Sequence, residues 1–300
     1  MSGGTRRVLV LGASSFIGRR LFARLGADAA YGTYAHRPVP GGVRFDAETM
    51  DLAAVIERPA ELSHAVLLLG NTNPDACARD LAGSRRLNVT AIAQIVDRLA
   101  EWGVMPVFLS TEAVFDGRRG RYVESDVVGP LMAYAAQKVE IERHLATRGP
   151  GLVVRLARVY GSARGDGTLF TGWLEQAERG EAIRCASDNV LSPIHVDDVV
   201  ATLLTLIRGG HTGTFHVAGE EPRTRLALLE TLLAEYGRRR ASAARAIPCR
   251  LADFATLEPR PRDISLDPAK AIAATGVRPR TVVTACREIV DAWCAEAVPA

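Results

Sequence analysis

The sequence is nearly free of lysine. Of its 37 basic residues only two, Lys138 and Lys270, are lysines, and the others are arginines. Acidic residues number 34, so the net charge is only +3, and no block of five or more like charges occurs. We therefore expect no nucleic-acid partner and no membrane partner, since both are usually bound through such blocks. A lysine kept in so arginine-rich a chain indicates a position that needs a compact ammonium group.

The cysteines lack the spacing of a disulfide framework or a zinc site. They are odd in number and widely separated, and no C-x-x-C pair occurs among Cys77, Cys185, Cys249, Cys286 and Cys294. We expect reduced thiols, mostly in the core of a cytoplasmic protein, and no bound metal.

Long hydrophobic runs are also missing. The first apolar run, Val8 to Leu11, is too short for a signal peptide, and no stretch reaches the roughly 20 apolar residues of a membrane span. We expect a soluble, unexported protein. Its 300 residues, 48% of them hydrophobic, suffice for one large core or for two lobes.

Short apolar runs alternate with longer amphipathic ones in the first half of the chain. This alternation is typical of a parallel sheet covered by helices on both faces. The predicted strands are Arg7 to Leu11, Ala30 to Tyr34, Val43 to Phe45, Ala65 to Leu69, Pro106 to Ser110 and Leu152 to Leu156. The predicted helices are Phe16 to Leu25, Asp51 to Ile56, Asp75 to Ala100, Ala133 to Thr147 and Phe170 to Glu178.

Six strands with crossover helices predict an α/β protein with a doubly wound parallel sheet of the Rossmann type. We expect a dinucleotide-binding domain over residues 1–158. Residues 159–300, where the alternation loosens, should form mainly a smaller C-terminal substrate-binding lobe over the carboxyl edge of the sheet. Segments within about residues 190–218 should return to the first domain.

The turn after the first strand predicts a phosphate-binding loop. It runs Gly12-Ala-Ser-Ser-Phe-Ile-Gly18 into a helix, where a dinucleotide fold brings backbone close to a pyrophosphate. Ser15 replaces the usual middle glycine and supplies a hydroxyl donor. The expected cofactor contacts here are Gly12, Ser14, Ser15, Phe16, Ile17 and Gly18. The alternative is a tightly packed turn with no ligand.

The residues after the second strand favour NADP(H) over NAD(H). No acidic residue stands where an NAD enzyme binds the ribose 2′-hydroxyl, whereas His36 and Arg37 suit a 2′-phosphate. Arg37 could equally be a solvated loop residue. Asp46, followed by Ala47, closes the third strand and could accept a hydrogen bond from the adenine amino group, or simply cap the next segment.

Tyr134 and Lys138 lie one helical turn apart. A tyrosine can donate a proton to a carbonyl oxygen, and a fixed cation nearby lowers its pKa and lets it work in both directions. The lysine could also hold the ribose of a cofactor. An ordinary amphipathic helix with a solvated lysine is the alternative, but the scarcity of lysine argues against it.

Upstream, a strand ends in Ser110-Thr111, a hydroxyl pair that could polarise the same carbonyl. We choose Thr111, with Ser110 as second candidate. Without Tyr134 and Lys138, such a pair would more often serve turn formation.

These residues resemble the extended short-chain dehydrogenase/reductase superfamily, most closely its dTDP-4-dehydrorhamnose reductase-like sugar-nucleotide reductases. The similarity runs along essentially the whole chain, through GASSFIG, RRLNVTA, LSTEAVFDG, RYVESD, GPLMAYAAQK, VRLARVYG, DNVLSPIHVDDVV, TGTFHVAGEE and RPRDISLDPAK.

The resemblance implies a catalytic triad of Thr111, Tyr134 and Lys138. It implies that Asn88, at a helix kink, connects Lys138 to solvent through a bound water. Further cofactor contacts implied by it are Leu69, Gly70, Asn71, Leu156 and Ala157, and substrate contacts are Glu112, Arg158 and the loop around Pro193. Departures at Ser15, Gly70-Asn-Thr-Asn, Arg158 and Asp263 bear on the identity of the sugar more than on the chemistry.

The resemblance implies an NADPH-dependent reductase of a nucleotide-activated 4-keto-6-deoxysugar that works as a monomer or homodimer. One alternative is a sugar-nucleotide epimerase or dehydratase, although dehydratases of this group usually carry a carboxylate pair where this chain has Glu112 and Ala113. The other is a non-catalytic NADP-binding regulatory subunit, because one relative of these reductases serves a methyltransferase-like partner in that way.

Overall fold

The computed structural model describes residues 6–295, and these form two compact units. The first comprises the chain up to Val114, Val128–Arg155 and Leu203–Phe215; the second comprises Phe115–Val127, Leu156–Thr202 and the chain from His216 onward. The domain boundary expected at residue 158 stays a prediction.

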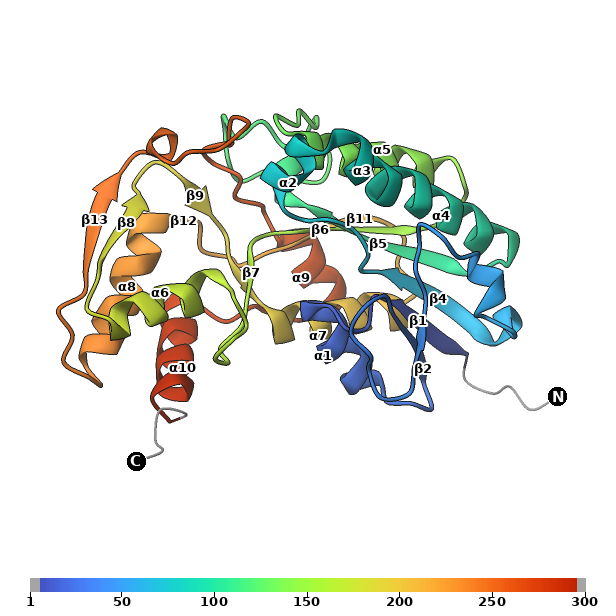
Figure 1. Ribbon diagram of the computed structural model, residues 1–300, viewed down its shortest axis with the longest axis horizontal. Coiled ribbons are helices and arrows are strands. Elements are labelled where there is room, and N and C mark those ends of the chain that lie inside the picture. The colour runs from blue at the N-terminus through green and yellow to red at the C-terminus, as the bar shows by residue number, and fades with distance from the viewer. Residues whose placement is uncertain (1–5, 296–300) are drawn as a thin grey trace. The chain divides into compact units, whose positions relative to one another are not determined.

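A seven-stranded sheet forms the centre of the first unit (Figure 1). Its order is β11-β6-β5-β4-β1-β2-β3, and β1 to β5 pair in parallel. The strands are β1 (Arg7–Leu11), β2 (Ala30–Tyr34), β3 (Gly42–Arg44), β4 (Leu62–Leu67), β5 (Met105–Thr111), β6 (Leu152–Leu156) and β11 (Gly213–Val217). The order reverses between β1 and β4, and in such folds a dinucleotide binds beyond the carboxyl ends of the strands at that point.

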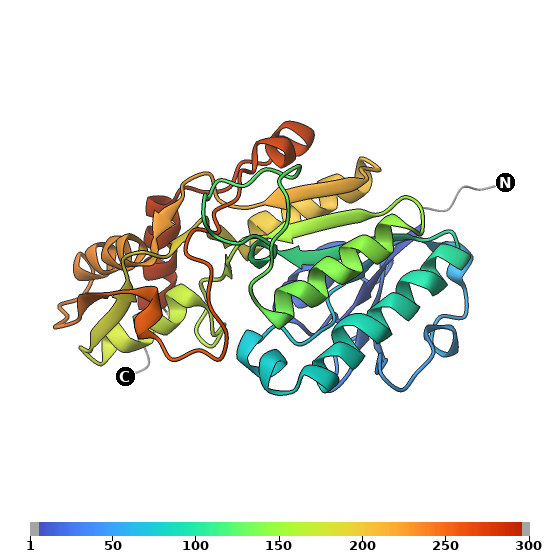
Figure 2. The same cartoon turned by 90° about the horizontal axis from the view of Figure 1, so that it is seen from above.

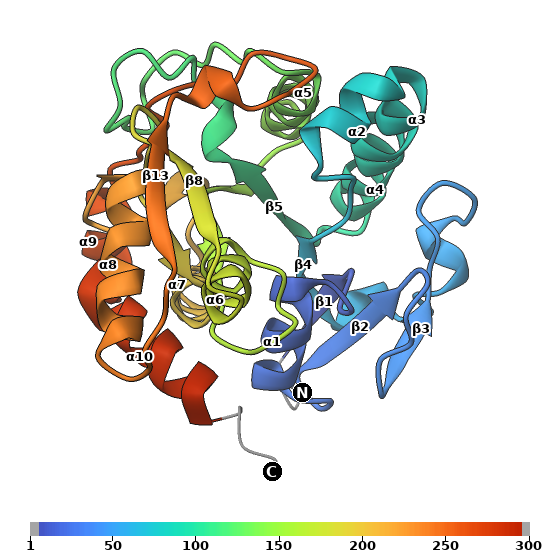
Figure 3. The same ribbon diagram turned by 60° about the vertical axis from the view of Figure 1, so that its left-hand side comes forward.

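Helices cover both faces of this sheet, as Figure 3 shows with α2 to α5 on one side and α1 on the other. Helices α4 and α5 lie side by side, the teal and green helices in front of the sheet in Figure 2. The elements are α1 (Phe16–Leu25), α2 (Pro74–Arg79), α3 (Leu81–Arg85), a π-helical turn (Arg86–Ala91), α4 (Ile92–Glu101) and α5 (Ala133–Ala146), with 3-10 turns at Leu52–Ala54, Pro59–Glu61 and Glu112–Val114. Helix α7 (Val196–Arg208) belongs to this unit only from Leu203 onward. Apolar residues from both layers form its core, among them Leu9, Leu67, Ile92, Phe108 and Ile141.

The second unit packs helices against short strands around its own core, which contains Phe170, Leu228 and Trp293. Its helices are α6 (Leu169–Glu178), α8 (Arg225–Gly237), α9 (Ala269–Thr275) and α10 (Val282–Ala295), with a 3-10 turn at Leu251–Asp253. Its strands pair in twos, β7 (Val159–Tyr160) with β10 (Ile194–His195), β9 (Val190–Leu191) with β12 (Arg223–Thr224), and β8 (Ala182–Ala186) with β13 (Arg245–Cys249).

The predicted α/β doubly wound fold is confirmed, with three corrections. The sheet has a seventh strand, β11, that was not predicted. The expected helix Asp51 to Ile56 is only the 3-10 turn Leu52–Ala54. The expected single helix Asp75 to Ala100 is divided into four segments. Asp80 leaves the helical conformation between α2 and α3, and its carboxylate caps α3 by accepting from the amide of Gly83. The π-helical turn then separates α3 from α4.

All five cysteines are free, and Cys77, Cys185 and Cys286 are buried. Within residues 6–295, no helix combines the length and apolar character needed to cross a membrane.

Candidate active site

The loop after β1 requires glycine at both ends. Gly12 has a φ of 87°, and a Cβ there would lie 2.8 Å from the carbonyl oxygen of Leu68, just beyond β4. A Cβ on Gly18 would lie 2.2 Å from the oxygen of Gly12, so the helix can approach the strand only without a side chain. The chain thus brings bare backbone to the point where the strand order reverses, as a bound pyrophosphate requires.

Ser15 caps the N-terminus of α1. Its hydroxyl oxygen accepts a hydrogen bond from the amide of Gly18 at 3.1 Å. The hydroxyl that replaces the usual glycine therefore has a structural role, and its expected role as a donor to phosphate stays a prediction.

His36 and Arg37 lie in the bend after β2, and both side chains are exposed. Within the described residues, neither side chain makes a hydrogen bond or an ion pair. Thr33, at the end of the same strand, accepts from the amide of Gly12 at 3.2 Å and so joins this bend to the phosphate loop. The position is compatible with recognition of a 2′-phosphate.

Asp46 takes part in a local turn. Its carboxylate accepts from the amide of Glu48 at 3.1 Å. This bond matches the structural alternative stated from the sequence, and contact of Asp46 and the adjacent Ala47 with adenine stays a prediction.

Asn88 holds the loop that follows β4. Its side-chain oxygen accepts from the amide of Asn71 at 2.7 Å, and its side-chain nitrogen donates to the carbonyl oxygen of Asn71 at 3.0 Å. Gly70, with a φ of 125°, is confined by the same side chain, since a Cβ there would lie 2.8 Å from the Asn88 oxygen. The helix irregularity implied at Asn88 is present as the π-helical turn Arg86–Ala91. The implied water link to Lys138 stays a prediction.

Gln137 extends this arrangement to α5, and sequence reasoning missed it. The Asn88 side-chain nitrogen donates to Gln137 at 2.8 Å, and Gln137 donates to the hydroxyl of Ser84 at 2.8 Å. All three side chains are buried. The loop expected to contact the cofactor is thereby connected to the helix that carries Tyr134 and Lys138. The position of Gln137, one residue before Lys138, was the only available signal.

Tyr134 and Lys138 lie on the buried face of α5. The Lys138 ammonium donates to the carbonyl oxygen of Leu109 at 2.9 Å, and it lies 4.7 Å from the ring centre of Phe108 and 6.0 Å from that of Tyr134. Burial lowers the pKa of Lys138 to about 8. The lysine is thus no solvated surface residue; it is held against the end of β5 and still mostly carries its charge at neutral pH.

The two hydroxyls at the end of β5 have different surroundings. Ser110 is buried and donates to the carboxylate of Glu142. Thr111 is only partly buried, and its oxygen accepts from the amide of Ala113 at 3.2 Å, which leaves its hydroxyl proton available for a donor role. This difference favours Thr111 over Ser110 as the group that polarises a carbonyl.

The remaining predicted residues are divided between the units. Glu112, in the first unit, begins the 3-10 turn after β5 and is buried. In the second unit, the carbonyl oxygen of Arg158 accepts from the amide of Ile194 at 3.0 Å, next to Pro193. Leu156 and Ala157 are buried, and Arg158 is exposed.

A family model described as "RmlD substrate binding domain" matches residues 6–294. The dTDP-4-dehydrorhamnose reductase of Aggregatibacter actinomycetemcomitans is 25% identical over 285 residues, which cover 91% of this chain and 94% of the relative. Methionine adenosyltransferase 2 subunit beta of Danio rerio is 26% identical over 231 residues, covering 73% and 71%. By its name, this relative is a subunit of an adenosyltransferase. The partner that Sequence analysis described as methyltransferase-like is corrected accordingly.

Solved structures share the fold. A dTDP-4-dehydrorhamnose reductase of Bacillus anthracis in complex with NADP has a TM-score of 0.78 at 18% identity, covering 98% of this chain and all of the other. MoeE5 in complex with UDP-glucose and NAD has a TM-score of 0.80 at 20% identity, covering 97% and 100%.

Proposed function

The chain belongs to the RmlD substrate binding domain family, and from that membership and the site geometry we propose that it is an NADPH-dependent reductase of a nucleotide-activated 4-keto-6-deoxysugar. The resemblance stated from the sequence is confirmed at the level of this family. The observation that carries the proposal is the buried pair on α5, with the Lys138 ammonium fixed on Leu109 and close to Tyr134.

The residues around β1 and β4 fit a dinucleotide. Gly12 and Gly18 leave a cradle that any Cβ would fill, and Asn88 shapes the adjacent loop. When bound, NADPH supplies the hydride. Arg37 would contact its 2′-phosphate, with His36 beside it.

The protein's own groups handle the oxygen of the ketone. Tyr134 would donate a proton to that oxygen, and the Thr111 hydroxyl would hold it by a second hydrogen bond. The Lys138 ammonium, still mostly charged at neutral pH, would stabilise the ionised phenol. Tyr134 could then give up its proton more readily during reduction and, as the phenolate, take a proton from the alcohol in the reverse direction. Proton transfer and carbonyl polarisation are thus assigned to two neighbouring elements, α5 and β5.

A group of arginines in the second unit supports a nucleotide-activated substrate. The guanidinium carbons of Arg225 and Arg184 lie 5.7 and 5.8 Å from the ring centre of Phe254. Burial lowers the pKa of Arg225, and the positive charge of Arg158 acts in the same direction. Within residues 6–295 these three arginines form no ion pair, and the buried Nε of Arg225 has no hydrogen-bond partner. Unpaired guanidiniums beside an aromatic ring suit a diphosphate next to a base.

The test is to incubate the purified protein with NADPH and a panel of dTDP-4-keto-6-deoxyhexoses. Loss of NADPH in equal amount to a reduced sugar supports the reductase. Turnover of the sugar without net loss of NADPH would instead indicate an epimerase or dehydratase.

The similarity to methionine adenosyltransferase 2 subunit beta favours a second candidate, a non-catalytic NADP-binding subunit. Tight binding of NADPH without turnover of any ketone in the same assay would support it and would contradict the reductase.

A further inference from the structure

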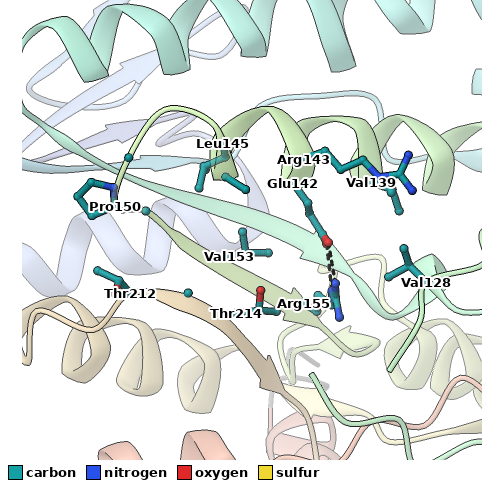
Figure 4. Close-up of a pocket in the computed structure, with 14 residues that line it drawn as sticks. Val128, Val139, Glu142, Arg143, Leu145, Pro150, Val153, Arg155, Thr212 and Thr214 are labelled. Carbon is teal, nitrogen blue, oxygen red and sulfur yellow. Dashed lines mark hydrogen bonds and ion pairs between the residues drawn. The ribbon is translucent and has the colours of Figure 1, made fainter. Parts of the chain in front are cut away.

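A buried ion pair lies one helical turn beyond Lys138. Glu142, on α5, accepts from Arg155, on β6, through two hydrogen bonds, from Nε at 3.1 Å and from Nη2 at 2.8 Å. The two side chains are only 10% and 7% exposed. Figure 4 shows the pair bridging from the helix to the strand. Paired geometry of this kind fixes both elements against each other.

The same carboxylate holds the end of β5. Ser110 donates its hydroxyl proton to Glu142, and Ser110 directly precedes Thr111. Lys138 meets the same strand one residue earlier, at the carbonyl oxygen of Leu109. Glu142 therefore joins three elements, α5, β5 and β6, immediately behind the groups proposed to act on the ketone.

The pair also affects the charge of Lys138. Burial is the largest influence on the pKa of Lys138 and lowers it, while the carboxylate of Glu142 opposes the decrease. The titratable and charged groups facing this region are Cys77 from α2, Tyr134 and Glu142 from α5, and Arg155 from β6. Glu142 is the carboxylate among them, with its charge balanced by Arg155.

We propose that Glu142 and Arg155 are positioning residues that hold the Lys138 turn of α5 against Ser110–Thr111. The Glu142 carboxylate in addition favours the charged form of the Lys138 ammonium. The functional part of this inference rests on the proposed reductase activity. Neither residue touches the reacting atoms; each acts through Lys138 and Thr111. Glu142 was not identified from the sequence, because a glutamate four residues after a lysine is also the pattern of an ordinary surface pair.

Helix α5 offers a matched control. Glu140, two residues before Glu142, pairs with Arg85 at 2.8 Å, with both side chains nearly half exposed. An exposed pair of this kind contributes little and lies on the opposite side of the helix from Lys138. Substitution of Glu140 removes the same charge from the same helix without touching the buried pair.

A pocket gives access to the buried pair. It has a volume of about 450 Å³ and lies between the C-terminal part of α5, β6 and the start of β11, with Glu142 and Arg155 in its lining (Figure 4). Replacement of Glu142 by alanine would leave Arg155 facing this space. A small carboxylate from solution could then take the place of the missing side chain.

The charge effect is tested by NMR of the protein labelled with ¹³C at the lysine Cε. Because the chain contains two lysines, the spectrum should show two titrating signals, and Lys270→Arg assigns them. Glu142→Gln should make Lys138 bind its proton about tenfold more weakly, and Arg155→Met should make it bind more tightly, because an unpaired carboxylate then remains nearby. Glu140→Gln should change nothing. An equal pKa of Lys138 in wild type and in Glu142→Gln would overturn the charge role. If the pKa of Lys138 moved in the same direction in Glu142→Gln and in Arg155→Met, the charge role would also be contradicted, because only a general loosening of the structure would explain it.

The positioning role is tested by kinetics and rescue. Glu142→Ala should lower kcat by about 10- to 100-fold with little change in the KM for NADPH, and formate or acetate should restore activity in a saturable manner. Chloride at equal ionic strength should not restore activity. Formate or acetate should not restore the activity of the double variant Glu142→Ala, Arg155→Met. Absence of rescue in a folded Glu142→Ala protein would contradict the proposal. If the wild type reduces no ketone, the proposed function fails, while the NMR titration still decides the charge role of the pair.

Discussion

Each unit contains an arginine with a buried side-chain nitrogen, but in the part of the chain that the structure describes only the arginine of the first unit is paired with a carboxylate. In the first, Arg155 donates two hydrogen bonds to the carboxylate of Glu142. In the second, Arg225 has a buried Nε without a partner within the described residues, and the positive charge of Arg158 adds to the effect of burial in lowering its pKa. An ion pair within the protein fixes the geometry of the elements that carry it. A partly buried cation without a paired anion lowers the stability of the folded protein, and binding of an anionic ligand removes this cost. This contrast fits the proposed function, in which the first unit carries out the chemistry and the second binds an acidic substrate.

The largest effect is expected at Tyr134, the proposed proton donor in the first unit. Tyr134→Phe should lower kcat by about 10²- to 10⁴-fold, the usual contribution of general acid catalysis, with binding of NADPH retained. Steady-state kinetics with the substrate found in the panel would measure it, and Tyr31→Phe, whose hydroxyl only meets Glu61, is the control. If the kcat of Tyr134→Phe stayed within threefold of wild type, Tyr134 would not be the proton donor, and the assignment of the chemistry to the first unit would be contradicted.

The two arginines themselves give the most direct contrast. Arg155→Met should destabilise the protein by about 3–5 kcal/mol, because it leaves the buried Glu142 unpaired. Arg225→Met should leave stability unchanged or raise it, but should increase the KM for the nucleotide sugar about 10- to 100-fold through loss of charge-assisted hydrogen bonds.

Denaturant unfolding and initial-rate measurements on the same preparations separate these two outcomes. Loss of stability in Arg225→Met with no change in KM would show that both arginines are structural and would end the comparison.

Arg37 should behave as a ligand-binding arginine within the first unit. Arg37→Ala should raise the KM for NADPH about tenfold and leave that for NADH nearly unchanged, because only NADPH carries the 2′-phosphate. The effect should shrink at high salt. Arg24→Ala, an exposed arginine in the last turn of α1, is the control, and equal effects on both cofactors would place Arg37 away from the 2′-phosphate.

The smallest expected effect concerns the stability cost of Lys138. Its pKa is lowered from 10.5 to about 8 in the folded protein, so between these pH values the unfolded chain binds more protons and stability should rise with pH. Lys138→Met should therefore raise the unfolding temperature by a few degrees at pH 7 and show no such gain above about pH 10.5, despite loss of activity. Thermal unfolding across this range, with Lys270→Met as control, measures it; a drop in Tm at pH 7 would mean that the bond to Leu109 outweighs the burial of the charge.

Local patterns predicted the sheet well. The bounds of β1, β2 and β6 and of α1 follow from apolar runs and punctuating residues, since these depend on neighbours in sequence. The strand β11 was missed because its five residues lie within the second half of the chain, where the alternation loosens, and join the sheet only by pairing beside β6.

The site was predicted in part for the same reason. Tyr134 and Lys138 form a local spacing on one helix and could be found, whereas Gln137 and Arg155 gain their meaning from partners on other elements, Asn88 and Glu142. Periodicity marks such polar positions as exposed, although tertiary contacts bury them. The helix predicted from Asp75 to Ala100 failed for a related reason, because capping by Asp80 and the contacts of Asn88 override its propensity.

The π-helical turn at Arg86–Ala91 has a consequence for tolerance to insertion and deletion. A π turn accommodates one more residue than the α-helix around it, so it behaves as a retained single-residue insertion that rotates everything beyond it. With that extra residue, Asn88 points to the loop after β4 while Ile92, Ile95, Val96 and Leu99 still face the core. Removal of any one residue within 86–91 would restore a regular helix. Either Asn88 would then point away from the loop after β4, or the apolar residues of α4 would point away from the core. The length of this segment is therefore fixed by both contacts.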